Sequence, residues 1–537
     1  IYQHQQGYFD NLENGRTKAD KNLTLVRPSI KFAPSEDFDL TLIGEWQQNN
    51  GGPATSQNIV NPEFPKLAQT LFRYVPPDDK YDVRHNLQGY SNSEVKQLIA
   101  EANWKVAGGV VTGVAGWRDV TFDSSTDFDG SPITLFHFKD NKESQDQRSV
   151  EVRYASDFSD RFNFTTGLYW FDQSFFVGER RETFGGTIVN GVPTVINTAG
   201  VTNQDQNNTA VFAQGTYRFT DAWALTLGGR YTKEEKEIVF SPPGRCALDF
   251  SSCTVALPGK KDWNNFSPKV GVDWRATDAV LTYASWTRGF RSGVFNQRAQ
   301  RVEFLGPSEP EVVDSYEIGV KSELADRRVR LNAAVFSMQY DDIQKILNES
   351  FDPDGPGPQP PTSGQVVRNA AEATIQGAEV ELSWRASDAL SIDASLGYTD
   401  AKYDEFPGTD VNGDGRPDPE LAKELKFEKV PEWTGYAGAS YEIPLGTDDT
   451  VTLRGSYSYT SKFYTDQLNR DWLAQDGFGL LDASVTFARG ERWQVSLWGK
   501  NLTDEEYIDF AADVGTLGSW VFGGEPRRYG VEFRANF

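Results

Sequence analysis

The clearest metal-binding pattern in this chain is an acidic loop that follows position 409. Oxygen-bearing side chains stand at positions 1, 3, 5 and 9 of the loop: Asp410, Asn412, Asp414 and Asp418. With Gly415 at position 6, this is the front half of an EF-hand-type calcium loop. Leu421 replaces the bidentate glutamate expected at position 12. Calcium is therefore one interpretation of the 410–418 loop, and an acidic loop built from turn residues is the other.

The two cysteines, Cys246 and Cys253, form a second pattern with chemical meaning. They are the chain's only cysteines and lie close together in a segment rich in Pro, Gly and Ser. An isolated close pair in a loop predicts a disulfide formed in an oxidising compartment. Two unpaired thiols are the alternative, and a zinc site would need further ligands that this segment does not offer.

The remaining reactive residues do not form a catalytic pattern. The three histidines, His4, His85 and His137, are scattered, so a histidine-rich metal centre is not expected. No G-x-S-x-G nucleophile motif and no phosphate-binding P-loop occur. We therefore predict that the protein is not an enzyme.

Composition restricts the partners and the class of fold. The 537 residues carry a formal net charge of −24, which argues against nucleic acid as the main partner. A mean hydropathy of −0.54, without an apolar run near 18 residues, excludes a bundle of transmembrane helices. A transmembrane β-barrel remains open, because its strands are apolar on one face only.

Alternation with a period of two dominates the chain. Residues 209–221 and 223–232 alternate large with small and apolar with polar side chains, and a tight Thr-Asp turn joins them, which predicts a hairpin. Similar short turns recur at 33–37, 107–109, 155–160, 218–221, 275–278, 324–327, 385–388, 444–449 and 488–491. Longer connections alternate with them, at about 50–92, 128–142, 184–206, 242–264, 297–309, 350–365, 406–424 and 511–526.

This asymmetry of connections predicts an outer-membrane barrel, with short turns on the periplasmic side and long loops outside. Nine short-turn hairpins and a final strand from Arg528 to Phe537 give nineteen strands. Tryptophans recur near the predicted strand ends, where they would form girdles at the membrane interfaces: Trp104, Trp117, Trp170, Trp223, Trp286, Trp384, Trp433 and Trp498. Cross-strand packing in a soluble sheet is the alternative role for them.

Several motifs resemble those of TonB-dependent receptors. The segment 498–507 (WGKNLTDEEY) with 524–530 (GEPRRYG) is similar to their C-terminal signature. Residues 310–324 (PEVVDSYEIGVKSEL) resemble a mid-barrel block, and 330–344, 376–382, 283–293 and 266–271 resemble further blocks in family order. The terminal Phe537, on an alternating strand, resembles the signal that the barrel-assembly machinery recognises.

The resemblance implies an all-β, antiparallel transmembrane barrel of the 22-strand type. Since the chain supplies about nineteen strands, the resemblance implies that the N-terminal plug and the first three strands are absent, so that 1–537 is a partial barrel domain. It also implies the outer membrane of a Gram-negative bacterium, with its lipid and lipopolysaccharide, as the location. The expected partners are the TonB–ExbB–ExbD complex and a plug domain that is missing from the chain or supplied by another polypeptide.

The iron-receptor branch that the chain resembles suggests active uptake of a ferric siderophore. An anionic ferric chelate would favour arginines and aromatic residues near the outer strand ends. The candidates are Arg288, Arg291, Arg298, Trp263, Tyr403, Phe406, Trp472 and Trp520. The arginines could equally pair with lumen carboxylates, and loop packing is the alternative for each aromatic residue. An oligosaccharide, cobalamin or an aromatic compound as cargo, and a passive porin-like channel, are the alternative functions.

Overall fold

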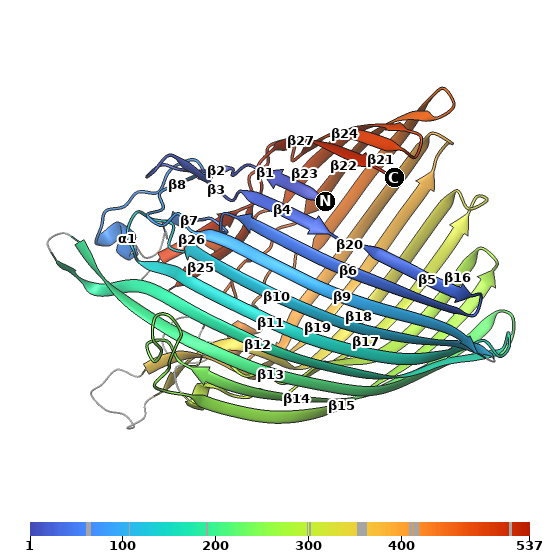
Figure 1. Cartoon of the computed structure of the whole chain (residues 1–537), viewed down its shortest axis with the longest axis horizontal. Helices are drawn as coiled ribbons and strands as arrows, with labels where there is room; N and C mark the ends of the chain where they lie inside the picture. Colours follow the sequence, from blue (N-terminus) through green and yellow to red (C-terminus); the bar gives the residue numbers. More distant parts are fainter. Residues whose placement is uncertain are drawn as a thin grey trace.

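The computed structural model describes residues 1–60, 66–106, 108–189, 192–297, 299, 302–351, 362–407, 411, 418–514 and 518–536, although the side chains of 192, 348–351 and 362–365 are left out. Almost all regular structure is β-strand. One antiparallel sheet contains 21 strands and curls around so that the strands of its two walls face each other (Figure 1). No helix among the described residues is long and apolar enough to cross a membrane.

The first wall of the sheet contains the N-terminal strands. They are β1 (Tyr2–Gln5), β4 (Lys21–Val26), β5 (Ser29–Ser35), β6 (Phe38–Gly51), β9 (Tyr90–Val106), β10 (Gly109–Asp127), β11 (Phe136–Ser156), β12 (Phe162–Val189), β13 (Val192–Arg218), β14 (Trp223–Ser241) and β15 (Leu257–Thr277). The second wall continues with β16 (Val280–Arg291), β17 (Glu311–Leu324), β18 (Val329–Phe351), β19 (Thr362–Arg385), β20 (Leu390–Glu405), β21 (Trp433–Leu445), β22 (Asp449–Thr460), β23 (Phe478–Arg489), β24 (Trp493–Lys500) and β27 (Arg528–Ala535).

The strand count confirms the prediction of an antiparallel barrel with about nineteen strands. Strands β4 and β5 follow one another along β6 and act as one strand, and β1 is a four-residue fragment paired with β4. With those two adjustments, nineteen strands remain in the described sheet. Each of the nine predicted short turns joins two consecutive strands, and these turns gather at one end of the barrel (Figure 1).

Several predicted long connections overlap strands, among them 128–142 with β11 and 242–264 with β15, and two are mostly strand. The segment 184–206 lies largely within β12 and β13, whose ladder continues to the pair Val189↔Val192 after an irregularity between Phe184 and Ile188. Its many Val, Ile and Thr residues favour extended backbone over an open loop. The segment 511–526 contains most of a hairpin made of β25 (Ile508–Val514) and β26 (Gly518–Gly523), which pairs with β7 (Ser56–Ile59).

Smaller elements occupy the long-loop end of the barrel. Strands β2 (Phe9–Asn11), β3 (Arg16–Lys18) and β8 (Asp82–Val83) form a separate small sheet. Two short helices, α1 (Leu67–Thr70) and α2 (Pro419–Ala422), and the 3₁₀ turns η1 (Val302–Phe304) and η2 (Asp471–Leu473) complete the elements. The largest apolar core also lies at this end, where Trp263, Phe295 and Phe406 pack together.

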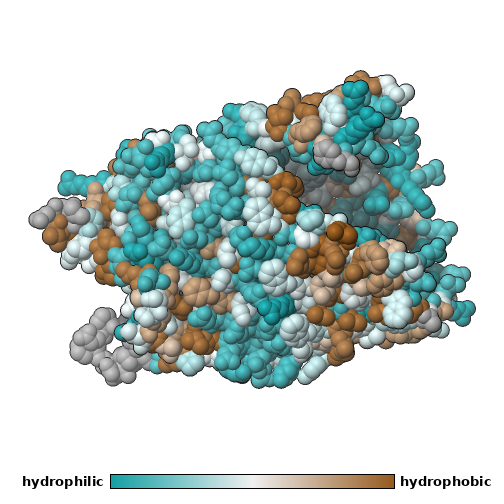
Figure 2. All heavy atoms as spheres, in the orientation of Figure 1, coloured by the Kyte–Doolittle hydropathy of each residue, from teal (hydrophilic) through white to brown (hydrophobic). Residues whose placement is uncertain are grey.

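Strand alternation distinguishes the lipid face from the lumen face. Phe175 and Arg181 of β12 line an internal cavity. The pairing of β12 is regular over 162–184, so the odd-numbered residues of this stretch point inward. Even positions such as Leu168, which is 64% exposed, therefore point outward. Apolar residues are interspersed over the outer wall in the space-filling view (Figure 2).

This assignment predicts a strong effect of a charge on the outer face. We expect Leu168→Arg to destabilise the barrel by about 2–4 kcal/mol. Leu168 lies six positions after Phe162, the first residue of β12, and a tilted strand of that length reaches about halfway through an apolar band roughly 25 Å tall. The control Gln214→Arg places the same charge at an inward position of β13, three residues beyond Val211, the partner of Leu168. Urea unfolding in lipid vesicles, followed by heat-modifiable gel migration, measures both. Equal destabilisation by the two variants would contradict the assignment of faces.

Candidate ligand-binding pocket

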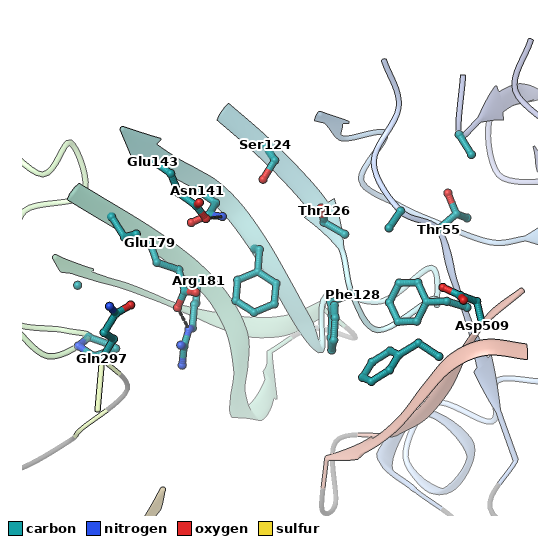
Figure 3. Close-up of a pocket in the computed structure, with 18 of the residues that line it drawn as sticks. Thr55, Ser124, Thr126, Phe128, Asn141, Glu143, Glu179, Arg181, Gln297 and Asp509 are labelled. Carbon is teal, nitrogen blue, oxygen red and sulfur yellow. Dashed lines mark hydrogen bonds and ion pairs between the residues drawn. The ribbon is translucent and has the colours of Figure 1, made fainter. Parts of the chain in front are cut away.

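A cavity of about 670 Å³ lies inside the long-loop end of the barrel. Strands β10, β11 and β12 supply one wall, and β25 and β26 supply part of the opposite wall (Figure 3). The residues that carry its chemistry are Tyr8, Phe9, Thr55, Ser124, Thr126, Phe128, Phe138, Asn141, Glu143, Phe175, Glu179, Arg181, Phe240, Gln297, Asp509, Phe510 and Phe522. This volume and its aromatic lining fit a medium-sized organic ligand.

Phe128 is the centre of the aromatic wall. Its ring centroid lies 5.6 Å from that of Phe136, 5.4 Å from Phe138, 5.1 Å from Trp520 and 5.6 Å from Phe522. The first three pairs are edge-to-face, the arrangement that the charge distribution of aromatic rings favours. These contacts hold β26 against the β10–β11 wall, so the pocket's shape depends on them.

The polar side of the pocket is acidic. Glu143, Glu179 and Asp509 contribute three carboxylates, and Arg181 is the only lining residue among those described that carries a positive charge. Arg181 Nε forms a short contact with Glu179 Oε1, and its guanidinium lies 5.7 Å from the centre of the Phe138 ring. Arg181 and Asp509 lie on opposite sides of the pocket (Figure 3). Since the guanidinium is already paired, the pocket presents a net negative field to a ligand.

A buried ion pair fixes the hairpin that closes the pocket. Lys66 Nζ lies 2.8 Å from Asp513 Oδ1, and each side chain is 8% exposed. Arg470 Nη1 approaches the other oxygen of Asp513 at 3.3 Å. These contacts tie β25 to the segment before α1 and to the loop around η2.

The predicted ligand arginines that the structure describes are paired with neighbouring strands. Arg288 donates two hydrogen bonds to Asp314, which also accepts one from Trp286 Nε1 at 3.0 Å. Arg291 Nη2 donates to Glu311 Oε2 at 2.7 Å. Pairing with carboxylates of the lumen was the alternative role for these arginines. Arg298 lies outside the described residues.

The predicted ligand aromatics lie in packed clusters around the loops. Trp263 is buried, and its Nε1 donates to Glu309 at 3.1 Å. Tyr403 stacks on Phe427 at 4.2 Å beside Phe406, and the Lys345 ammonium lies 5.0 Å from the Tyr403 ring. Trp472 packs around Leu473, and the buried Trp520 packs behind Phe128. None of the described residues predicted to bind ligand is among those that line the pocket.

Most of the predicted calcium loop lies outside the described residues, including Asp410, Asn412 and Asp414. Asp418 is described, and its Oδ2 accepts a hydrogen bond from Val411 N at 3.0 Å. The last residue, Phe537, also lies outside the described part of the chain.

Cys246 and Cys253 form a disulfide in the loop between β14 and β15, with an S–S distance of 2.06 Å. The carbonyl of the neighbouring Arg245 accepts hydrogen bonds from the backbone N and the side-chain Oγ1 of Thr254, on the other arm of this loop. Closing so short a loop stabilises the folded loop by about 2–3 kcal/mol in the chain-entropy model.

This disulfide predicts a protease-resistant loop. We expect Cys246→Ser to accelerate trypsin cleavage after the exposed Arg245 by tenfold or more, because the open loop reaches extended conformations more often. Mass spectrometry of timed digests locates the cut, and dithiothreitol should reproduce the effect on the unsubstituted protein. Heat-modifiable migration should stay unchanged. An equal cleavage rate with and without the disulfide would contradict this role.

Comparison with known proteins places this barrel in a family. Residues 16–502 match the family model described as TonB dependent receptor-like, beta-barrel. The chain belongs to the TonB-dependent receptor family. The protein is accordingly an outer-membrane barrel of a Gram-negative bacterium, and the family is one of receptors rather than enzymes.

Individual relatives are distant. The chain is 24% identical over 479 residues to the ferrioxamine B receptor of Salmonella typhimurium, which covers 86% of this chain and 60% of that receptor. It is 24% identical over 274 residues to the ferric-pyoverdine 358 receptor of Pseudomonas putida, covering 50% of this chain and 29% of the relative. The chain thus spans well under two thirds of the length of either relative.

Solved structures share the fold. The ferric yersiniabactin uptake receptor FyuA of Yersinia pestis matches with a TM-score of 0.77 and 16% identity, covering all of this chain and 74% of FyuA. The siderophore receptor PiuA of Acinetobacter baumannii matches with a TM-score of 0.75 and 16% identity, covering 99% of this chain and 76% of PiuA.

Proposed function

We propose that this protein serves TonB-dependent uptake of a scarce iron complex, a ferric siderophore, across the outer membrane. The observation that carries this proposal is the aromatic cavity at the long-loop end of the barrel, which faces the outside in barrels of this kind. A cavity of about 670 Å³ suits a chelate of siderophore size. The names of the relatives, which include receptors for ferrioxamine B and ferric pyoverdine, favour the same cargo.

In this proposal the energy for release comes from the inner membrane. The TonB–ExbB–ExbD complex acts on a plug domain inside the barrel. Lipid and lipopolysaccharide surround the lipid-facing side of the barrel. At the short-turn end of that side, the exposed Trp223 and Trp274 stack at 5.7 Å.

The charge of the pocket narrows the class of iron complex. Three carboxylates face one guanidinium that is already paired with Glu179, so an anionic chelate would meet repulsion. A neutral or positively charged complex, with an apolar periphery that packs on Phe128 and Phe138, fits the lining better. This differs from the anionic chelate considered from the sequence.

Uptake of ⁵⁵Fe bound to a positively charged trihydroxamate tests the function. Iron-starved host cells and a strain lacking the gene are compared with and without a protonophore. Active uptake requires a signal that disappears on deletion and on protonophore treatment. Uptake that survives the protonophore would instead indicate a passive channel. Identical uptake by the deletion strain would reject this cargo, and growth on other TonB-dependent substrates would then be compared.

A further inference from the structure

Two aspartates and a histidine meet at the long-loop end of β10 and β11. Asp127 is the last residue of β10 and pairs in register with His137 of β11, and Asp129 follows in the connection. One ligand atom from each side chain lies within 4.8 Å of the others. All three are buried, with exposed fractions of 0%, 0% and 2% for Asp127, Asp129 and His137. The intervening Phe128 lines the ligand pocket, so this cluster lies directly behind the pocket wall.

The histidine ring is directed at both carboxylates without a hydrogen bond to either. His137 Nε2 lies 3.6 Å from Asp127 Oδ2 and 3.5 Å from Asp129 Oδ2. Among the residues that the structure describes, neither ring nitrogen has a hydrogen-bond partner, although both are buried. Such separations are too long for good hydrogen bonds. They are close to, and slightly longer than, the roughly 3.3–3.5 Å between two ligand atoms that share a tetrahedral ion at about 2.0–2.1 Å.

The surrounding residues hold the ligands, and one buried ammonium, that of Lys18, lies near enough to interact with the charge of Asp127. Asp129 accepts hydrogen bonds from Ser131 N and Oγ, Leu135 N and Phe136 N, which fixes its carboxylate. The nearby Lys18 ammonium bonds instead to His85 Nδ1 at 2.6 Å and to Leu87 O at 2.9 Å. Within the described residues, neither aspartate forms an ion pair with a lysine or arginine.

Glu182 lies on the other side of the imidazole. Its Oε2 is 3.5 Å from His137 Nδ1, and Arg180 and Lys139 lie within 3.8 Å of its carboxylate. A carboxylate at the distal nitrogen is the usual outer partner of a metal-bound histidine. Burial of two bare carboxylates side by side is unfavourable, since both side chains are fully buried. A bound divalent cation would remove that cost.

We infer that Asp127, Asp129 and His137 form a site for a divalent transition-metal ion of the zinc type. One imidazole with two carboxylates suits Zn²⁺ better than Ca²⁺, which prefers oxygen ligands alone. The ion joins the end of β10 to the start of β11, and Asp127 Oδ2 also accepts a hydrogen bond from Leu87 N at 3.3 Å. The metal thereby stiffens the wall that carries Phe128 and Phe138. This site is independent of which iron complex the protein transports.

Zinc titration of the full chain tests the site. The detergent-solubilised protein is treated with EDTA, dialysed and titrated with ZnCl₂ by calorimetry, with metal analysis after gel filtration. We expect one Zn²⁺ per chain and a zinc-dependent rise in melting temperature. His137→Gln and Asp127→Asn should each weaken binding at least thirtyfold and remove the thermal shift.

His4→Gln is the matched control, because His4 is exposed on β1 and bonds to Asn22 away from the cluster. It should bind zinc like the unsubstituted chain. Heat-modifiable migration verifies that each variant is folded. If His137→Gln does not fold, the zinc titration is made with Asp127→Asn alone. The inference is overturned if the unsubstituted chain binds no zinc, or if the folded cluster variants bind it equally well.

Discussion

Phe128→Ala is expected to weaken binding of the ferric complex by about thirtyfold or more. The phenyl ring joins four other rings, and each aromatic pair contributes about 0.5–1.5 kcal/mol beyond simple burial. Its loss removes a contact surface for the ligand and releases β26 from the β10–β11 wall. A loss of about 2 kcal/mol in binding corresponds to the stated factor. Fluorescence titration of the purified protein and ⁵⁵Fe uptake by cells measure it.

Two variants separate the pocket effect from a general effect on the barrel. Phe487→Ala removes a ring that contacts Trp493 at 5.5 Å near a short turn, so it should leave ligand affinity unchanged. Phe128→Leu keeps apolar volume and should recover part of the affinity. An unchanged dissociation constant for Phe128→Ala, in protein with normal heat-modifiable migration, would show that the ligand binds elsewhere.

Reversing one charge in the pocket should reverse its preference between ligands. Glu143→Lys changes the local charge by two units, and a ligand charge about 6 Å away interacts with each unit by about 2–3 kcal/mol at an effective dielectric constant of about 20. Solvent screening reduces this, since Glu143 is partly exposed and also accepts a hydrogen bond from Asn141 at 3.1 Å. We expect affinity for a cationic ferric complex to fall about ten- to thirtyfold, while affinity for ferric citrate rises.

Parallel titrations at low and high salt provide the measurement, because the effect should shrink as ionic strength increases. Glu420→Lys makes the same substitution at a side chain that is 87% exposed and does not line the pocket. That variant should alter neither affinity. If Glu143→Lys and Glu420→Lys behave alike, the carboxylates of the pocket do not select the ligand.

The barrel was predictable from local pattern because each strand pairs with its neighbour in the chain. Turn residues such as Thr220-Asp221 and the alternation around them specify a hairpin without long-range information. The same local pattern predicted too long a loop after Phe184. The β12–β13 ladder continues there, and its residues have the composition of a polar loop.

The pocket was not predictable, because its residues come together only when distant segments meet. Phe128 and Arg181 follow the same alternation as every inward residue, and nothing local distinguishes them. Trp520 and Phe522, which contact Phe128, lie near the other end of the chain, on a hairpin that was expected to be a loop. The pairing of Asp127 with His137 depends on a register shift between Ser124 and Thr126, which sequence alone does not reveal.

The hydrogen bond from Arg528 to Gln5, at 3.0 Å, joins residues that are 523 positions apart, whereas the strand ladders join consecutive hairpins. Assembly can therefore proceed by adding one hairpin after another, each at a small cost in entropy. A last step then brings β27 and the N-terminal strands together. The entropy of that step grows only logarithmically with length and amounts to about 5–6 kcal/mol for such a separation. We therefore expect the barrel wall to separate first between β27 and the N-terminal strands under mechanical load or heat.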